Sequence, residues 1–216
     1  MLEKMSDFFE ARVDGYDNHM ISNVPGCNEG YRIMSKLLPK STENLLDLGC
    51  GTGLELDEIF KTHPSIKVTG IDLTQAMLDR LSEKHHDKDI TLINASYFDY
   101  DFGLEKYNAV VSFQTMHHYS HDMKIKLYSR IYSALKPGGR YIECDYMVIA
   151  QEDEDFYYSE NERIRKEQNI PEGEFYHYDT PCTIENQIKM FKLAGFEEAS
   201  MVWREENTTI IVADKV

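Results

Sequence analysis

The sequence predicts an α/β protein built on one mostly parallel β-sheet. Apolar, strand-like segments alternate with amphipathic, helix-like segments, which is typical of parallel strands joined by helices. A glycine-rich turn, "DLGCGTG", follows the first predicted strand after residue 40, as in folds that bind a nucleotide there. No internal repeat, linker or low-complexity tract divides the 216 residues, so we expect a single domain spanning 1–216.

The elements follow this alternation in order. Residues 1–40 form a predicted helical lead-in that ends near Pro39. The helix after the first strand is predicted to begin at Thr52, because "TGLE" has the form of a capping box. An apolar stripe between residues 127 and 135 predicts a later helix that stops at "KPGG". The five strands expected in this region are 44–49, 67–72, 90–95, 107–113 and 139–146.

The alternation pauses after the fifth strand. Residues 150–182 are acidic and aromatic, and they form a predicted cap insertion that is part helix and part loop. Its aromatic side chains fit two interpretations, the packed interior of a lid or the walls of a substrate pocket. Thr183 is predicted to cap a helix that runs to Leu193 and stops at Gly195, and an antiparallel hairpin turning near 205–207 completes the chain.

Composition restricts the classes of partner. The net charge is −15, from 38 acidic and 23 basic side chains, and such a surface repels nucleic-acid backbones. No apolar run approaches the ~20 residues of a membrane span, and no Lys/Arg-led apolar leader is present. The four cysteines are far apart and contain no C-x-x-C pair, which predicts free thiols and no metal site. We therefore expect a cytoplasmic protein that acts on a small soluble molecule.

The glycine-rich turn has an acidic setting. Gly49, Gly51 and Gly53 let a ligand approach the backbone closely. Asp47 precedes the turn, and further carboxylates crowd residues 55–58, where those at 57 and 58 also fit as partners of the helix dipole. Two like charges about 6 Å apart cost roughly 3 kcal/mol at an effective dielectric constant of 20. The turn therefore favours a cationic ligand, and it disfavours the pyrophosphate of a nicotinamide dinucleotide.

Asp72 ends the second predicted strand, 19 residues beyond Gly53. A carboxylate at this place accepts hydrogen bonds from both hydroxyls of a ribose in dinucleotide folds, and it also fits as a cap for a helix beginning near Thr74. A ligand with a ribose, a positive charge and no phosphate matches S-adenosylmethionine (SAM).

Several stretches of the chain resemble the class I SAM-dependent methyltransferases. The matching stretches are "LLDLGCGTG", "VTGIDLTQAML", "INASYFDYDF", "YNAVVSFQTMHHY" and "LKPGGRYIE", in the family's order across 44–146. The resemblance implies a Rossmann-like fold whose seven-stranded, mostly parallel sheet ends in an antiparallel C-terminal hairpin. It also implies SAM as methyl donor and S-adenosylhomocysteine (SAH) as product.

The resemblance assigns cofactor contacts by position. The turn and its preceding carboxylate meet the methionine part, Asp72 meets the ribose, and the residues after the third strand meet the adenine. The family often has an aspartate where Ser96 stands, so that contact departs from the pattern. The implied cofactor-binding residues are Asp47, Gly49, Cys50, Gly51, Gly53, Asp72, Leu73, Ser96, Tyr97, Phe113 and Gln114.

A second resemblance covers nearly the whole chain. "FFEARVDGYDNHMISNVPG" and "TIENQIKMFKLAGFEEASMVW" look like the carboxy-SAM synthases of tRNA wobble-uridine modification. Cys27 stands where the synthases carry a ligand-binding tyrosine, and "IPEGEFYHYD" lacks the arginine with which they hold the extra carboxylate. We therefore expect ordinary SAM as the substrate, with the synthase activity, or SAM binding without turnover, as alternatives. The same likeness suggests a homodimer.

The candidate catalytic residues lie where the carboxyl ends of the strands meet the variable segments. Because the leaving group of SAM is already a sulfonium, the remaining tasks are to align the acceptor, exclude water and remove a proton. Tyr16, His117, His118, Asp145 and His177 are the candidates for these tasks. One of the vicinal histidines also fits a packing role, and Asp145 fits a structural one. No third ligand accompanies the two histidines in the sequence, so no metal is expected there.

Overall fold

The structure, a computed structural model of residues 1–216, is built on an eight-stranded sheet. Its main path runs β3-β2-β1-β4-β5-β8-β7, and the two-residue strand β6 pairs with β5 beside this path. β1 to β5 are parallel to one another, whereas β8 runs antiparallel to both β5 and β7. The strands are β1 Asn44–Leu48, β2 Lys67–Asp72, β3 Ile90–Asn94, β4 Tyr107–Phe113, β5 Leu135–Val148, β6 Cys182–Thr183, β7 Glu198–Glu205 and β8 Thr208–Asp214.

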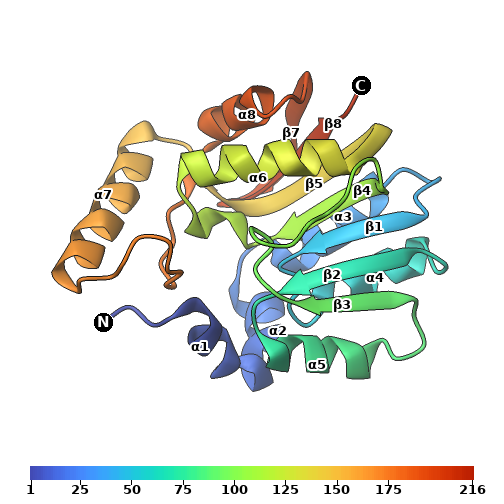
Figure 1. Cartoon of the computed structure of the whole chain (residues 1–216), viewed down its shortest axis with the longest axis horizontal. Coiled ribbons are helices and arrows are strands. Elements are labelled where there is room, and N and C mark those ends of the chain that lie inside the picture. The colour runs from blue at the N-terminus through green and yellow to red at the C-terminus, as the bar shows by residue number, and fades with distance from the viewer.

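Helices cover both faces of the sheet. α6 and α8 lie on the face toward the viewer in Figure 1, and α3 and α4 lie behind it. The helices are α1 Met5–Glu10, α2 Val13–Asn23, α3 Cys27–Leu37, α4 Leu54–Thr62, α5 Gln75–Lys84, α6 His121–Ala134, α7 Gln151–Glu167 and α8 Ile184–Leu193, with a 3-10 helix, η1, at Met116–His118.

Alternation along the strands supplies two hydrophobic cores, one on each face of the sheet. Leu45 and Val111 pack with α3 and α4, whereas their neighbours Leu46 and Val110 pack with α6 and α8. Successive strand side chains point to opposite faces, and because helices cover both faces, nearly every position of β1 and β4 is buried. The buried strands fix the position of the loops at their carboxyl ends.

The lead-in helices and the cap insertion meet at the carboxyl ends of the parallel strands. Figure 1 shows α1, α2 and α7 at that end. The two segments are joined by backbone hydrogen bonds from Met5 to Phe175 and from His177 to Glu3, each 3.0 Å long. Ligands of open α/β sheets bind at this end of the strands.

Side-chain contacts from α2 tie the lead-in to the sheet domain near the glycine-rich turn. The Thr52 hydroxyl donates to Asp17 Oδ1 at 2.5 Å, and Arg80 of α5 lies 2.6 Å from Asp14 Oδ1. These contacts hold the lead-in over the glycine-rich turn.

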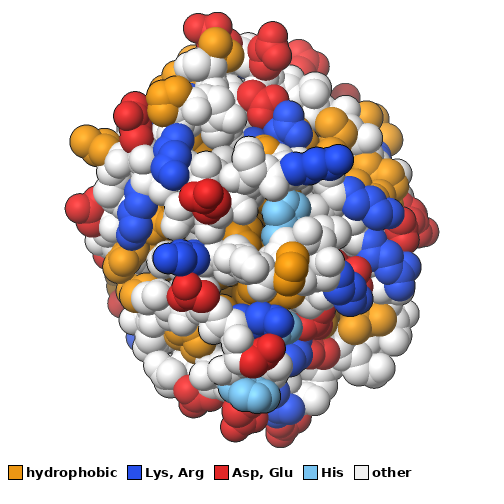
Figure 2. Space-filling view, turned by 90° about the vertical axis from the view of Figure 1, so that its right-hand side faces the viewer, with side chains coloured by type: hydrophobic (Ala, Val, Ile, Leu, Met, Phe, Trp, Pro, Cys, Tyr) orange, Lys and Arg blue, Asp and Glu red, His pale blue; other side chains and the backbone are white.

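The opposite end of the molecule carries no broad area of one charge. Figure 2 shows basic and acidic side chains interspersed over that face. None of the helices combines the length and the apolar character that a bilayer crossing demands. The four cysteines are buried free thiols.

The predicted fold class is confirmed, including the hairpin, the helical lead-in and the cap insertion. Thr183 caps α8 as predicted, because its side chain accepts a hydrogen bond from Asn186 N, and the hairpin turns at 206–207. β6 is a short eighth strand that the sequence pattern did not indicate.

Two boundaries were predicted wrongly. α4 begins at Leu54, not at Thr52, because Gly53 adopts a left-handed conformation (φ 75°) and the Thr52 hydroxyl bonds to Asp17 instead of capping the helix. β5 begins at Leu135, before the "KPGG" stretch, because Leu135 pairs with Tyr107 ahead of a register shift.

Candidate active site

The glycine-rich turn wraps around the carboxylate that ends β2. Gly51 N donates to Asp72 Oδ2 at 2.9 Å, and Thr74 N donates to Asp72 Oδ1 at 2.8 Å. Asp72 therefore bonds the start of α5, as the capping interpretation predicts, and it also lines a cavity; its contact with a ribose stays a prediction. Gly49 (φ +72°) packs against β4's following loop, where a Cβ would lie 2.6 Å from Thr115 Oγ1.

Two buried acids lie beneath the turn. Asp47 is fully buried and neither of its carboxyl oxygens has a hydrogen-bond partner, while Glu55 in the first turn of α4 is 4% exposed. Burial raises the pKa of Glu55 to about 8, and burial together with the neighbouring Glu55 raises the pKa of Asp47 well above its usual value. An unpartnered buried carboxyl is costly, and a cationic ligand group would satisfy it.

A small cavity of about 50 Å³ adjoins the turn, and an even smaller one of about 10 Å³ reaches Glu55. Met5, Phe9 and Tyr16 of the lead-in line the former. Sites for drug-sized ligands measure about 300–1,000 Å³. The lead-in thus covers the place where the sequence predicts a cofactor. The predicted residues lining this cavity are Gly49, Gly51, Asp72, Leu73, Tyr97, Phe113 and Gln114.

The other predicted cofactor residues lie close to this cavity but do not line it. Cys50 lines only the 10 Å³ cavity and its sulfur packs on the backbone of β2. Gly53 allows close contact with Leu81, from which a Cβ would be 3.0 Å away. Ser96 accepts a hydrogen bond from Phe98 N at 3.2 Å and so shapes the turn after β3. Asp47, Gly53 and Ser96 line neither of these two cavities, nor the large one described next.

A much larger cavity, about 820 Å³, opens next to the small one. Phe9, Tyr16 and Gln114 line both, so a molecule in one would contact a molecule in the other. The walls come from the lead-in, η1, the end of β5, the cap loop and the turn of the β7–β8 hairpin.

A histidine–carboxylate cluster forms one wall of this large cavity. His117 Nδ1 lies 2.5 Å from Oδ1 of Asp145, which is buried behind it. On the other side, Oδ1 of Asp179 lies 3.5 Å from His117 Nε2, 3.6 Å from His118 Nδ1 and 3.9 Å from His177 Nε2. The fold thus gathers the predicted catalytic residues except Tyr16, which lies across the cavity on α2.

Burial and neighbouring charges shift the pKa values of His117 and His118 in opposite directions. Burial opposes protonation of His117, but Asp145 and Asp179 outweigh it and raise its pKa to about 9. Burial and the neighbouring His117 hold the pKa of His118 well below its usual range. The two vicinal histidines are therefore not equivalent.

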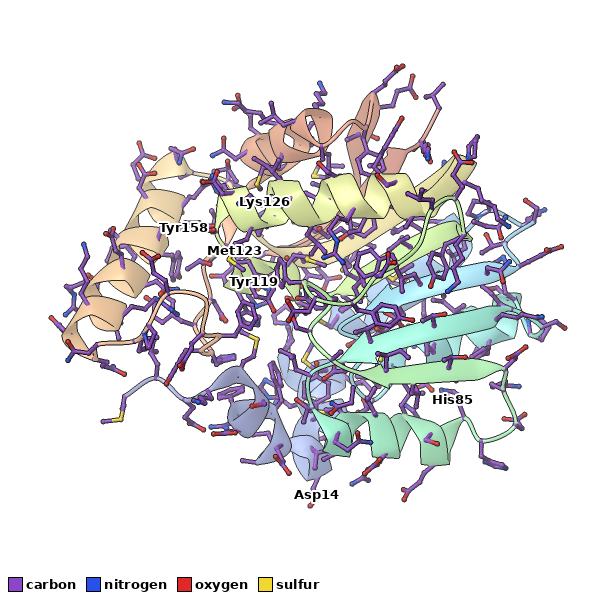
Figure 3. All side chains as sticks on the ribbon, viewed as in Figure 1. Asp14, His85, Tyr119, Met123, Lys126 and Tyr158 are labelled. Carbon is purple, nitrogen blue, oxygen red and sulfur yellow. The ribbon has the colours of Figure 1, made fainter.

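The cap insertion holds η1 in place. Thr180 donates to the carbonyl oxygen of His117 from its backbone N (2.6 Å) and its hydroxyl (2.9 Å). Tyr158 points from α7 toward α6, and its hydroxyl donates to Tyr119 O at 3.0 Å (Figure 3). Tyr157, Tyr158 and Tyr178 are half-buried and do not line the large cavity, so they do not form its walls.

Sequence reasoning missed Asp179 and Thr115. Asp179 lies in the loop between α7 and β6, far from the histidines in sequence, and no local pattern marks it. It supplies the third candidate metal ligand that the vicinal histidines lacked in the sequence, so the expectation that no such group accompanies them is wrong. Thr115 packs on Gly49 and bonds the Tyr97 hydroxyl at 3.0 Å.

Comparisons with known proteins agree with this geometry. The profile of the family described as "Methyltransferase domain" matches residues 45–139. Carboxy-S-adenosyl-L-methionine synthase from Nautilia profundicola is 26% identical over 99% of this chain and 96% of its own length.

Solved structures share the fold. A putative O-methyltransferase from Nostoc punctiforme superimposes with a TM-score of 0.73 at 18% identity, over 99% of this chain and 62% of that one. The complex of DhpI with SAM and HEP superimposes with a TM-score of 0.70 at 15% identity, over 96% and 94% of the two chains.

The residues around the turn fit SAM. Its ammonium and sulfonium groups are cations, which the unpartnered Asp47 and the buried Glu55 favour, and Asp72 stands at the ribose position. When bound, SAM supplies an activated methyl group, and this chain's residues bind and orient it. The match over residues 45–139 and the shared Rossmann-like fold make the chain similar to the class I SAM-dependent methyltransferases.

Proposed function

We propose that the chain transfers the methyl group of SAM to a small soluble acceptor held in the large cavity. One observation carries the proposal: a cavity of about 820 Å³ adjoins the cofactor site and is walled by the histidine–carboxylate cluster. Its size suits a metabolite, and convergent polar groups at one wall of a large pocket are typical of a catalytic site.

Because SAM is already an activated methyl donor, the protein has to align donor and acceptor rather than activate the donor. The S–CH₃ bond breaks, its electron pair stays on sulfur, and the methyl group bonds to the nucleophilic O, N or S atom of the acceptor. The acceptor atom must lie about 3 Å from the methyl group, with water excluded. Phe9 and Tyr16 stand where the two cavities meet and so position both molecules. The histidine cluster lies at the acceptor's wall, where a proton is to be removed.

The Asp145→Asn variant tests this role. We expect methyl transfer from labelled SAM to the small-molecule acceptor to fall about 100-fold or more, because the amide no longer fixes His117 as the carboxylate does. The SAH dissociation constant, measured by calorimetry, should stay within about twofold.

The matched control is His85→Gln, since His85 forms another close histidine–carboxylate pair, 2.8 Å from Asp57 and away from the large cavity. It should leave transfer unchanged. Unaltered transfer in Asp145→Asn, or the absence of any labelled product with the unmodified chain, would refute the proposed role or the proposed activity, respectively.

A second candidate is carboxy-SAM formation from SAM and prephenate. The relatives with that name, matched over nearly the full length of both chains, favour it. Arg12 is the one Lys or Arg side chain lining the large cavity, and it is bound to Glu3 at 3.2 and 3.3 Å. A free cation for an extra carboxylate is therefore missing from these walls. Mass spectrometry of the chain with SAM and prephenate discriminates: carboxylated SAM supports the second candidate.

Cofactor binding should release protons. The pKa of Glu55 is raised by burial to about 8, with Asp47, Lys84 and Asp57 as its charged neighbours, so near pH 7 the acid is mostly protonated. The ammonium group of SAM favours the ionised form, and its affinity should rise as the pH rises toward 8. Calorimetry at pH 7 in two buffers of different ionisation enthalpy should show this release, and Glu55→Gln should reduce it. Equal heats in both buffers would contradict the linkage.

A further inference from the structure

The carboxylate oxygen Oδ1 of Asp179 lies in an unusual place. It is buried and accepts no hydrogen bond, although the Asp179 side chain as a whole is 41% exposed. Nitrogen atoms of His117, His118 and His177 surround it at 3.5, 3.6 and 3.9 Å. Charge-assisted N–H···O⁻ bonds measure about 2.7–2.9 Å, so these distances are too long for direct bonds.

The same distances suit a bound cation. Metal–nitrogen and metal–oxygen bonds of zinc are about 2.0–2.2 Å long, so two ligand atoms in a tetrahedral site lie about 3.4 Å apart. The separations from Asp179 Oδ1 to His117 Nε2 and His118 Nδ1 are close to this value. The ligand atoms of His117, His118 and Asp179 all lie within 4.8 Å of one another.

Asp145 prepares His117 for this role. An ionised carboxylate only accepts hydrogen bonds, so the 2.5 Å contact fixes a proton on His117 Nδ1 and leaves Nε2 as the ring nitrogen that faces Asp179. A bound metal ion would take the place of the proton on Nε2 and lie between that nitrogen and Oδ1 of Asp179. A carboxylate behind a ligating histidine is the usual outer partner in metal sites.

We propose that His117, His118 and Asp179 bind a divalent transition-metal ion such as Zn²⁺. Two histidines and one carboxylate form a common ligand set for such ions, and three protein ligands leave a position open for substrate. The three residues line the large cavity, so the open position faces it. His118 would exchange its 3.3 Å contact with Tyr178 O for the metal, and His177 lies near enough to join as a further ligand.

The proposed metal site indicates a class of methyl acceptor, an inference that rests on the proposed function. The ion would bind an acceptor through a hydroxyl, thiol or carboxyl group and promote loss of its proton to solvent. The resulting anion is the nucleophile that takes the methyl group. Acceptors with a neighbouring pair of such groups fit best, because they chelate the ion.

Metal binding is tested without methyl transfer. The full-length protein is stripped with a chelator, and uptake of Zn²⁺ is measured by equilibrium dialysis. Co²⁺ serves as the optical probe. We expect one ion per chain, with visible ligand-field bands of a four- or five-coordinate Co²⁺ ion. His117→Gln and Asp179→Asn should weaken uptake at least 100-fold, and Asp145→Asn about 10–100-fold, the usual effect of losing an outer partner.

Three controls separate binding from folding and from turnover. His85→Gln should retain full uptake, because His85 lies beside α5, away from the cavity (Figure 3). SAH affinity shows that each variant is folded, and Zn²⁺ should raise the melting temperature of the unmodified chain but not of Asp179→Asn. Non-saturating uptake, or equal uptake by Asp179→Asn, would overturn the metal site. Saturating uptake without any methyl transfer would leave the metal site standing and defeat the proposed function.

Discussion

Replacing Gly49 by alanine should lower the free energy of unfolding by about 2–5 kcal/mol and abolish measurable SAH binding. A left-handed conformation costs a side-chain-bearing residue about 1–2 kcal/mol, and the new Cβ would lie 2.6 Å from Thr115 Oγ1 and 2.9 Å from Thr115 Cβ. Overpacking of this kind adds about 1–3 kcal/mol. Urea unfolding measures the loss, which corresponds to a shift in melting temperature on the order of 10 °C.

Gly138→Ala separates the two contributions. Gly138 has nearly the same conformation (φ +73°), but nothing lies within 4 Å of a Cβ placed there. The free energy of unfolding of Gly138→Ala should therefore fall by about 1–2 kcal/mol, which is the conformational contribution alone. Equal losses in the two variants would show that Thr115 yields easily and that the close packing of the turn on Thr115 contributes little.

The second large effect is expected from Asp72→Asn. A hydrogen bond to a charged group contributes about 1.5–3 kcal/mol, so the SAH dissociation constant should rise about 10- to 150-fold. The amide keeps the size of the side chain, but it loses the charge and one of the oxygen acceptors that serve Gly51 N, Thr74 N and the ribose. Calorimetric titration with SAH measures the change.

Asp101→Asn is the matched control. Asp101 accepts a hydrogen bond from the backbone N two residues ahead, Gly103, at 2.9 Å, as Asp72 does from Thr74 at 2.8 Å. Asp101 lines none of the three cavities at the candidate site. Its replacement should leave SAH affinity unchanged. A change in Asp72→Asn no larger than in this control would remove Asp72 from the binding site.

Much of the fold was predictable because its signals are local. Alternating apolar strands, a glycine-rich turn and the Thr183 cap each lie within a few residues, and each is present as predicted. The errors arose where a distant residue decides the outcome. Thr52 bonds Asp17, 35 residues away, instead of capping α4, and the start of β5 depends on pairing with Tyr107.

In the candidate site, too, the residues marked by local sequence were predictable and those brought in from distant segments were not. His117 and His118 were recognisable because they follow a strand end within a quoted motif. Asp179 was not, because only the hydrogen bonds from Thr180 to η1 bring that loop beside the histidines. Whether Asp145 lines the cavity or lies behind a histidine is likewise a matter of three-dimensional placement.

The contacts that hold the lead-in against the sheet domain have a consequence for the rate of turnover. Asp14 pairs with Arg80 and Asp17 with Thr52, and the lead-in that they hold places Met5, Phe9 and Tyr16 over a space far too small for an adenosyl group. We therefore expect these contacts to break when the donor enters and when the product leaves. Lid motions of this kind occur in microseconds to milliseconds and limit turnover in many enzymes. We therefore expect the first two helices to move before SAH can leave this chain.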